Sequence, residues 1–334
     1  MADVAAEAGV SPMTVSRALR NDTRVSDGTR KRIRETADRL GYVLDGLAAG
    51  LSSRRSGFVA MTIPALNSGN YADTARGLTE GLRHSGLDVL LGYTDYDKLE
   101  EERLIETFLR RRPEAVIITG SAHTDRCRNL LEQSAVPVIE IWELPETPID
   151  RVVGFSNAEA GRQIAMHLYE NGYRRMGFIG GDAAWDTRGA ARLQGFAQTL
   201  AGLDLPSDRR VSEGIPPVTM HQASAALDHL LERWPDTEAV MCVSDLSAFG
   251  VLSAAQKRGL SVPGDLAVAG FGAYELSDHT NPRITTVDVQ AHRIGAETAD
   301  LILEALADRP ASGSNRVIET AVHVLARGST AQVI

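Results

Sequence analysis

Residues 3–21 read DVAAEAGVSPMTVSRALRN and decide the fold of the amino-terminal part of the chain. Residues 4–8 carry an apolar stripe at helical spacing, and Gly9 can adopt the positive φ that ends a short helix. Ser11 suits the N-cap of a second helix and Pro12 its first position, where a missing N–H costs nothing. The stretch therefore predicts two short helices joined by a tight turn.

The second helix of this pair has one apolar and one polar face. Val15 and Leu19, four residues apart, point inward together with Ala18. The side chains left on the outer face are Met13, Thr14, Ser16, Arg17 and Arg20. A helix with small polar groups and arginines on one face fits the major groove of DNA, where Arg pairs with guanine.

A third helix is predicted in VSDGTRKRIRETADRLGY, residues 25–42. Ser26 is its expected cap and Gly41 its stop, and the buried stripe is expected to contain Ile33, Ala37 and Leu40. Three helices over one small core favour a helix-turn-helix module, and a plain helical cap on the following domain is the alternative.

Charge is distributed unevenly along the 334 residues, whose net charge is -9. Residues 1–56 hold ten Lys/Arg and seven Asp/Glu, whereas the remainder holds twenty-five and thirty-seven. A basic amino-terminal part on an acidic body limits contact with nucleic acid phosphates to that part. The composition thus disfavours a protein that wraps DNA around its whole surface.

The sequence shows no sign of a membrane, a secretion route or a metal site. No apolar run approaches the ~20 residues of a membrane span, and the start lacks a secretory layout, so we expect a cytoplasmic protein without membrane partners. Cys127 and Cys242 lie in separate stretches and are expected to be buried free thiols. We expect no disulfide, no metal and no cofactor.

From Gly57 onward, short β-rich runs alternate with helical ones. The runs are FVAMTI, LDVLLGY, EAVIIT, VPVIEI, MGFIGG, EAVMCVS and LAVAGF. Such βα units predict two doubly wound lobes, with a ligand bound where their strand ends face each other. GxGxxG, GxxxxGK[ST], HExxH and GxSxG patterns are absent, so an enzyme is the disfavoured interpretation.

The stretches at residues 3–21 and 25–42 are very similar to the signature of the lactose-repressor (LacI/GalR) family. The resemblance continues through GFVAMTIPALN, VGFSNAEAGR, ARLQGF, VSDLSAFG and ITTVDV to RGST. It implies an all-α helix-turn-helix head plus an α/β, two-lobed, periplasmic-binding-protein-like sensor of doubly wound parallel sheets. A free sugar-binding transport receptor would have no such head.

The resemblance also implies domain boundaries. They are a DNA-binding domain at 1–44, a hinge at 45–56, and an effector-binding and dimerisation domain at 57–334. Within the last, lobe one is expected at about 57–154 and 288–315, and lobe two at about 155–287 and 316–330.

Roles in binding operator DNA follow from the resemblance residue by residue. Met13 matches a base-reading position, with Thr14, Ser16 and Arg17 beside it. Positions that match contacts to the DNA backbone are Ser11, Arg24, Ser26, Thr29 and Tyr42. In the hinge, Leu51 matches a leucine that wedges into the minor groove, with Ala48 one turn before it. The family binds a pseudo-palindromic operator as a homodimer.

Effector contacts are implied in the same way. The matching positions are Asn67, Tyr71, Ser121, His123, Glu140, Trp142, Asn157, Arg188, Arg192 and Asp245. Arg192 in ARLQGF matches a ligand-holding arginine, and Arg188, one turn earlier, would project from the same face. Capping of a helix is the alternative role of Asp245.

One departure from the family indicates the class of effector. Most sugar-sensing relatives carry aspartate directly after the position of GF in LAVAGF, where this chain has Gly272. Loss of that carboxylate removes repulsion against an anionic ligand. MTVSRALRN, SAHT and VGFSNAEAGR also look like the gluconate-repressor branch. We therefore expect a sugar acid such as gluconate as the small-molecule effector, with a neutral sugar as the alternative.

Overall fold

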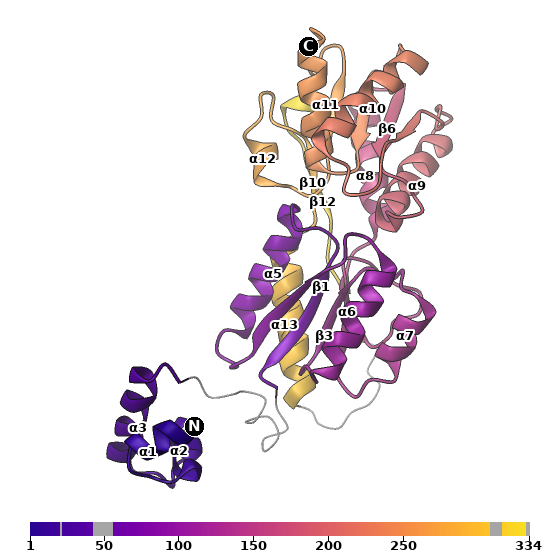
Figure 1. Cartoon of the computed structure of the whole chain (residues 1–334). Coiled ribbons are helices and arrows are strands. Elements are labelled where there is room, and N and C mark those ends of the chain that lie inside the picture. Colours follow the sequence, from indigo (N-terminus) through magenta and orange to yellow (C-terminus); the bar gives the residue numbers. More distant parts are fainter. Residues whose placement is uncertain (21, 43–55, 308–315, 332–334) are drawn as a thin grey trace. The chain divides into compact units, whose positions relative to one another are not determined.

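The computed structural model describes residues 1–20, 22–42, 56–307 and 316–331, and the chain divides into two compact units, 1–57 and 58–334 (Figure 1). The first unit is the head and the second the sensor. No helix in these described ranges is long and apolar enough to span a lipid bilayer.

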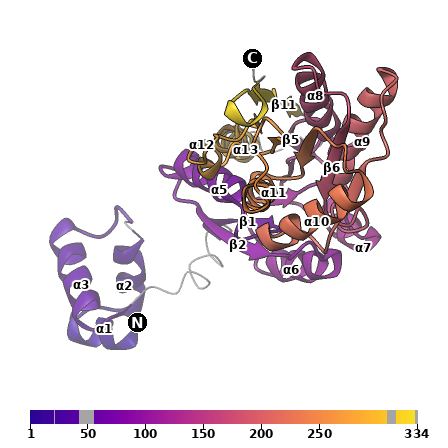
Figure 2. The same cartoon turned by 90° about the horizontal axis from the view of Figure 1, so that it is seen from above.

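Three helices in the described part of the head gather around one core (Figure 2). They are α1 (Ala2–Glu7), α2 (Pro12–Leu19) and α3 (Asp27–Arg39). Gly9 has φ +62° and Gly41 φ +61°, so both predicted turn glycines occupy the left-handed region. A 2.6 Å ion pair between Arg39 and Glu7 joins the ends of α3 and α1.

One residue of the predicted head core lies elsewhere. Leu40 is 43% exposed, whereas Ile33 and Ala37 are buried as predicted. Leu40 is the C-cap of α3, and the turn at Gly41 brings Tyr42 back against the core at this end of the helix. The expectation that Leu40 is buried was therefore wrong, because the helical period was extended past the last helical residue.

Lobe one of the sensor is built on a parallel six-stranded sheet with the order β11-β5-β4-β3-β1-β2. Its strands are β1 (Phe58–Ile63), β2 (Asp88–Tyr93), β3 (Val116–Thr119), β4 (Val138–Ile141), β5 (Arg151–Gly154) and β11 (Val317–Glu319). The side chains of β1 alternate between two core clusters, which lie on the two faces of the sheet.

Helices cover both faces of this sheet. Those on one face are α5 (Gly69–Leu82) and α13 (Ala291–Ala307), and those on the other are α6 (Lys98–Arg110) and α7 (Asp125–Glu132). Strands buried on both faces explain the continuous apolar runs that the sequence shows at β1, β3 and β4.

Lobe two has a parallel sheet with the order β7-β6-β8-β9. The strands are β6 (Met176–Gly180), β7 (Arg210–Ser212), β8 (Ala239–Cys242) and β9 (Ala267–Ala269). Its helices are α8 (Asn157–Glu170), α9 (Thr187–Gly202), α10 (Met220–Arg233), α11 (Asp245–Lys257) and the short α12 (Glu275–Asp278). The pairs α8/α9 and α10/α11 pack as units, which confirms the doubly wound architecture of the sensor.

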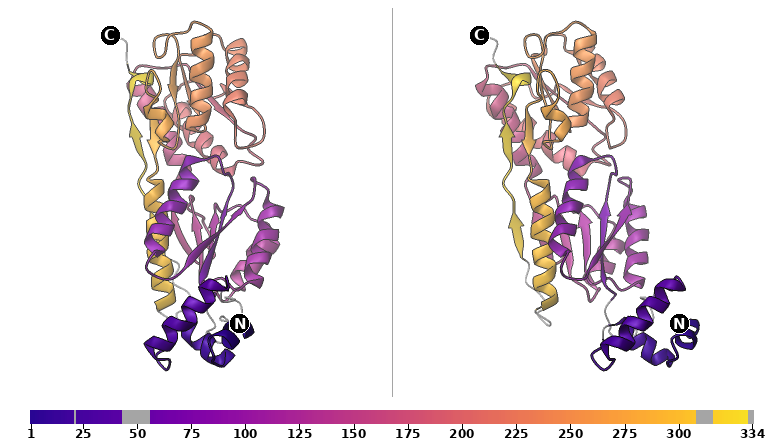
Figure 3. Two further views of the ribbon diagram at one scale, coloured as in Figure 1. Left: turned by 60° about the vertical axis from the view of Figure 1, so that its left-hand side comes forward. Right: turned by 90° about the vertical axis from the view of Figure 1, so that its left-hand side faces the viewer.

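The chain crosses between the lobes after β5 and again through β10 (Thr286–Asp288) and β12 (His323–Leu325), which pair antiparallel. Figure 3 shows the yellow strands β11 and β12 along one side of the sensor. Residues 316–330 were assigned to lobe two, but β11 pairs with β5 in the sheet of lobe one. The rest of that segment lies against lobe two, because β12 packs against α8 and the 3-10 helix η1 (Gly328–Thr330) packs against β9.

Candidate functional site

The outer face of α2 in the head presents the predicted base-reading side chains. Val15 and Ala18 are fully buried, whereas Met13 is 61% exposed and Thr14, Ser16 and Arg17 are half-buried. The Ser11 hydroxyl oxygen accepts from the Thr14 amide at 3.2 Å, so the predicted N-cap fixes the start of the helix. A buried inner face therefore holds a polar outer face in a defined orientation.

Three of the five predicted backbone-contacting residues, Arg24, Ser26 and Thr29, lie around the start of α3, whereas Ser11 caps α2 and Tyr42 follows the end of α3. The Ser26 hydroxyl caps the amide of Thr29 and donates to its hydroxyl at 2.9 Å. Exposed Arg24 binds the carboxylate of Asp22 at 2.6 Å and lowers the pKa of that carboxyl strongly. Arg24 is thus engaged by an internal carboxylate that a DNA phosphate would have to displace. The predicted hinge residues Ala48 and Leu51 lie outside the described residues.

The sensor contains a cleft of about 600 Å³, partly open to solvent, at the carboxyl ends of strands from both lobes. The described residues that line it are Asn67, Ser68, Asn70, Tyr71, Tyr96, Trp142, Asp186, Arg188, Arg192, Pro216, Pro217, Val218, Val243, Ser244, Leu246, Phe271 and Tyr274. Five of the ten predicted effector residues are among them: Asn67, Tyr71, Trp142, Arg188 and Arg192.

Arg192 is the buried cation on the lobe-two side of the cleft. Its Nη1 donates to Asn157 Oδ1 at 2.5 Å, and its Nη2 lies 3.8 Å from Asp186. The guanidinium carbon sits 4.2 Å from the ring centroid of Phe271. Its Nε is buried and has no hydrogen-bond partner among the described residues. A buried donor without a partner is costly, so the arrangement favours an acceptor supplied by a ligand.

Arg188 reaches across the cleft from α9 into lobe one. It donates to the Tyr71 hydroxyl at 3.2 Å and to the Thr119 carbonyl at 3.4 Å. Burial opposes its charge, but the phenols of Tyr71 and Tyr96 and the carboxylates of Asp186 and Glu143 together raise its pKa above the ordinary arginine value. Arg188 therefore stays cationic while it links the two lobes.

A second link between the lobes is made by hydroxyl groups. Ser68 Oγ, before α5 in lobe one, lies 2.8 Å from the hydroxyl of Tyr274 in lobe two. Burial raises the pKa values of Tyr274 and Tyr96, so both phenols remain neutral. The lining thus offers neutral hydroxyls next to two guanidinium groups.

Aromatic rings form the apolar wall. Trp142 packs edge-on against Tyr71, with centroids 5.1 Å apart, and against Phe155 at 5.6 Å. Its backbone φ is +75°, a strained value for a bulky side chain. The indole N–H donates to Thr74 Oγ1 at 3.3 Å, so packing and hydrogen bonding together hold the strained residue in the cleft.

Three predicted effector residues belong to lobe one but are not among the residues that line the cleft. Ser121 donates its amide and its hydroxyl to Glu143, and His123 bonds to Glu101 at 2.6 Å. Glu140 accepts the amide of Ile149, and burial raises its pKa. The sequence placed these residues correctly after β3 and on β4, but the structure does not place them among the residues that line the cleft.

The other two predicted residues support the lining from behind. Asn157 holds Arg192 and donates its amide to the Trp142 carbonyl at 3.1 Å. Asp245 is fully buried, accepts the Tyr274 amide at 2.7 Å and the Thr286 hydroxyl at 2.6 Å, and is the first residue of α11, which Ser244 caps. Burial raises the pKa of Asp245 to about 6. Both residues therefore position other groups.

Sequence reasoning missed several lining residues, among them Asn70, Tyr96, Asp186, Phe271 and Tyr274. The rule that ligands lie beyond the carboxyl ends of strands could have indicated Tyr96 after β2 and Tyr274 after β9. Gly272, noted in the sequence, has φ +120°, and a Cβ there would lie 2.6 Å from the Tyr274 ring. Tyr274 thus fills the space that a side chain at 272 would need.

Comparisons with known proteins agree with this architecture. Residues 1–45 match the family model "Bacterial regulatory proteins, lacI family", and residues 165–330 match "Periplasmic binding protein-like domain". The HTH-type transcriptional regulator GntR of Pseudomonas aeruginosa is 34% identical over 335 residues, which cover 98% of this chain and 94% of that protein. Catabolite control protein A of Priestia megaterium is 30% identical over 301 residues, covering 90% of each.

Among solved structures, a LacI-family transcriptional regulator from Silicibacter pomeroyi has a TM-score of 0.90 and 32% identity over 99% of this chain and 98% of that one. A helix-turn-helix head and a two-lobed cleft define a DNA-binding regulator that responds to small molecules. The chain belongs to the LacI family of bacterial transcriptional regulators. It is a DNA-binding transcriptional regulator and not an enzyme.

Proposed function

We propose that this regulator is a homodimeric repressor controlled by a sugar acid, gluconate or a close relative, bound in the sensor cleft. The observation that carries the proposal is the charge of the cleft. Of the described lining residues, the charged ones are Arg188, Arg192 and Asp186. Asp186 already accepts the Gly189 amide at 2.8 Å as the cap of α9. Among the lining residues cations therefore outnumber anions by two to one, with Glu143 also close to Arg188, and the Arg192 Nε–H has no partner among the described residues.

In this proposal the carboxylate of the sugar acid accepts hydrogen bonds from the guanidinium groups of Arg188 and Arg192. A planar guanidinium can donate two parallel hydrogen bonds to one carboxylate. Hydroxyls of the sugar acid bond to Ser68, Tyr274 and Asn67, and its carbon backbone lies on the aromatic wall. Gly272 supports the anion, because an aspartate at this position would repel it and would collide with Tyr274. A neutral sugar remains the second candidate.

Isothermal titration calorimetry of the full chain with gluconate, glucuronate and glucose tests the effector. We expect both acids to bind more tightly than glucose, with gluconate tightest. Arg210→Ala, which removes an exposed arginine on β7 away from the cleft lining, is the matched control and should bind like the wild type. Binding of glucose alone would disprove the sugar-acid proposal.

The head supports the DNA part of the proposal through its outer face. We propose that Met13, Thr14, Ser16 and Arg17 read bases, while Ser11, Arg24, Ser26, Thr29 and Tyr42 contact the DNA backbone. The operator is obtained by selecting duplexes from a random pool with the full chain. Reciprocal linkage then predicts that operator DNA weakens effector affinity by the same factor by which an inducer weakens operator binding.

Dimerisation is proposed through the sensor. Leu91 and Tyr93 are exposed on β2, an edge strand of the lobe-one sheet, and Leu66, which follows the neighbouring strand β1, is 65% exposed. Exposed apolar side chains on a sheet edge favour association of two copies. Sedimentation equilibrium should give twice the chain mass, and Leu91→Glu should shift the protein toward monomer. A monomeric wild type at micromolar concentration would contradict this part.

A further inference from the structure

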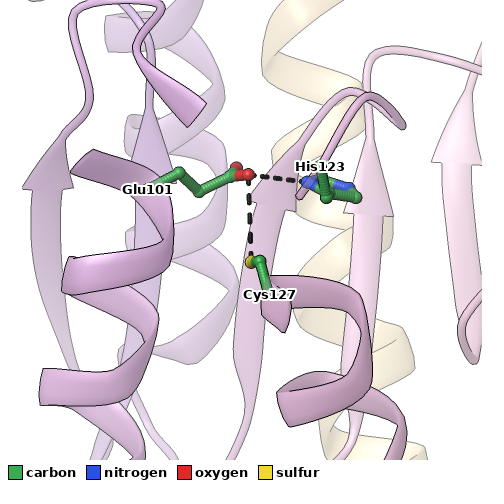
Figure 4. Close-up of side chains that lie close together, drawn as sticks. All are labelled: Glu101, His123 and Cys127. Atoms are coloured by element: carbon green, nitrogen blue, oxygen red, sulfur yellow. Dashed lines mark hydrogen bonds and ion pairs between the residues drawn. The ribbon is translucent and has the colours of Figure 1, made fainter. Parts of the chain in front are cut away.

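Three side chains of types that bind metal ions meet on the face of the lobe-one sheet that α6 and α7 cover, opposite α5 and α13. Glu101 comes from α6, Cys127 from α7, and His123 from the loop between β3 and α7 (Figure 4). Cys127 is fully buried, Glu101 is 7% exposed, and the His123 side chain is 2% exposed. None of the three lines the effector cleft, so the proposed function does not use this cluster.

The donor atoms already lie close to the spacing of a coordination sphere. His123 Nδ1 is 2.6 Å from Glu101 Oε2, Cys127 Sγ is 4.0 Å from the same oxygen, and all three ligand atoms lie within 4.8 Å of one another. Bonds of about 2.0 to 2.3 Å in tetrahedral geometry place ligand atoms about 3.3 to 3.8 Å apart. Side-chain shifts of about 1 Å would therefore fit an ion between them.

The second ring nitrogen of His123, Nε2, has no hydrogen-bond partner among the described residues. Nε2 is buried, and the nearby carboxylate of Glu140 has a buried Oε1 that likewise lacks a partner among them. Histidines that ligate metals through one nitrogen commonly turn the other toward a carboxylate or a carbonyl.

The surroundings carry a surplus of negative charge. Glu102 and Glu106, on the same helix as Glu101, are held by Arg126 at 2.7 and 2.8 Å. Glu101 has no such guanidinium partner among the described residues and meets only the imidazole and the thiol. Its carboxylate gives the cluster an electrostatic preference for a cation.

We propose that Glu101, His123 and Cys127 bind one divalent cation of the zinc class through a carboxylate oxygen, Nδ1 and a thiolate. Mixed O, N and S ligands suit Zn²⁺ and exclude Mg²⁺ and Ca²⁺, which require oxygen. On binding, the Cys127 thiol loses its proton to solvent as the metal–sulfur bond forms. Of the three proposed ligands, Glu101 also lines a second hollow, together with Lys98, Thr119, Ala122 and Arg188.

Cobalt serves as the spectroscopic probe, because tetrahedral Co²⁺ bound to thiolate has a charge-transfer band that carboxylates and histidines alone do not produce. The untagged full chain is titrated with Co²⁺ under a non-coordinating reductant. We expect one Co²⁺ per chain, the thiolate band, and loss of the band when Zn²⁺ is added. The melting temperature should rise with Zn²⁺ by mass action.

The two buried free cysteines supply matched variants. Cys242→Ala, in β8 of lobe two, should keep the band, and Cys127→Ala should lose it while retaining operator affinity. Glu101→Gln should weaken binding at least tenfold. The proposal is overturned if the wild type shows no thiolate band, or if Cys127→Ala retains it. Neither result depends on which effector occupies the cleft, so failure here leaves the proposed function standing.

Discussion

The outer face of α2 and the effector cleft differ in how their functional side chains relate to stability. On α2, Met13 is largely exposed, and the helix is held by the separate inner residues Val15 and Ala18. In the cleft, Arg188 and Arg192 are buried and hydrogen-bonded to the protein itself. A substitution on α2 should therefore change binding alone, whereas one in the cleft should change binding and folding together.

The largest effect that sharpens this contrast is expected from Arg192→Ala. Truncating one side of a buried charged contact costs about 2 to 5 kcal/mol of binding, or roughly 30-fold to several thousandfold in effector affinity. The free energy of unfolding should also fall by about 1 to 3 kcal/mol, because Asn157 and Asp186 lose their partner. Calorimetry and urea unfolding measure the two effects.

Arg192→Lys provides the second variant, since it keeps the charge but loses the planar fork. We expect an intermediate affinity, with acids still preferred over glucose. Unchanged affinity in both variants would remove Arg192 from the effector site.

Asp245 tests whether a buried residue that supports the cleft lining also makes the free energy of unfolding depend on pH. Its pKa rises from 3.8 to about 6 on folding, mainly through burial. The folded state thus holds this proton more tightly than the unfolded chain, and stability falls as pH rises from about 4 to about 6. The contribution amounts to at most about 3 kcal/mol.

Asp245→Asn should remove this pH dependence. The measurement is the free energy of unfolding of both proteins from pH 4 to pH 7, and the wild type should lose stability relative to the variant across that window. Asp300→Asn, at an exposed position on α13, is the control. Parallel curves for wild type and Asp245→Asn would contradict the assignment.

Alanine substitutions of Gly272 and Gly259 distinguish the cost of backbone strain from the cost of side-chain crowding in the cleft. Both have positive φ, +120° and +76°, but a Cβ at 259 would meet nothing within 4 Å, whereas one at 272 would lie 2.5 Å from Asn70. Gly272→Ala should therefore destabilise by about 1 to 3 kcal/mol more than Gly259→Ala. It alone should weaken effector binding, because Tyr274 must move. Equal losses would show that the space beside Gly272 is not restricted.

The two regions also differ in how far the sequence predicts them. The caps Ser11 and Ser26 and the turn glycines of the head act within three or four residues, so local patterns predicted them correctly. The links of the cleft span long separations, such as Ser68 to Tyr274 and Arg188 to Tyr71. Only the packing of two sheets brings such residues together.

The same reason explains the errors in the sensor. Ser121 follows β3 and Glu140 lies on β4, as the sequence predicted. The direction of each side chain, however, depends on strand register and on the neighbouring residues that cover it. β11 is three residues long and has no periodic pattern, so its pairing in the lobe-one sheet could not be predicted from the sequence. The meeting of Glu101, His123 and Cys127 was equally hidden, because an intervening strand separates α6 from the other two.

Arg17→Ala is expected to have the smallest effect on the free energy of unfolding. It therefore tests most directly the difference between the outer face of α2 and the cleft. If Arg17 pairs with a base, operator affinity should fall by about 1 to 3 kcal/mol, while affinity for random duplex changes little. Urea unfolding should stay within about 0.5 kcal/mol of the wild type, because the inner residues of α2 are untouched. Fluorescence anisotropy on both duplexes measures the binding.

Lys31→Ala is the matched control, since it removes an exposed cation from α3 that pairs only loosely with Glu35, at 4.0 Å. Its effect on operator and random duplex should be small and equal. An equal loss on both duplexes for Arg17→Ala would reassign that side chain to phosphate. A parallel fall in unfolding free energy would mean that the binding face of α2 also carries its stability, as the cleft does.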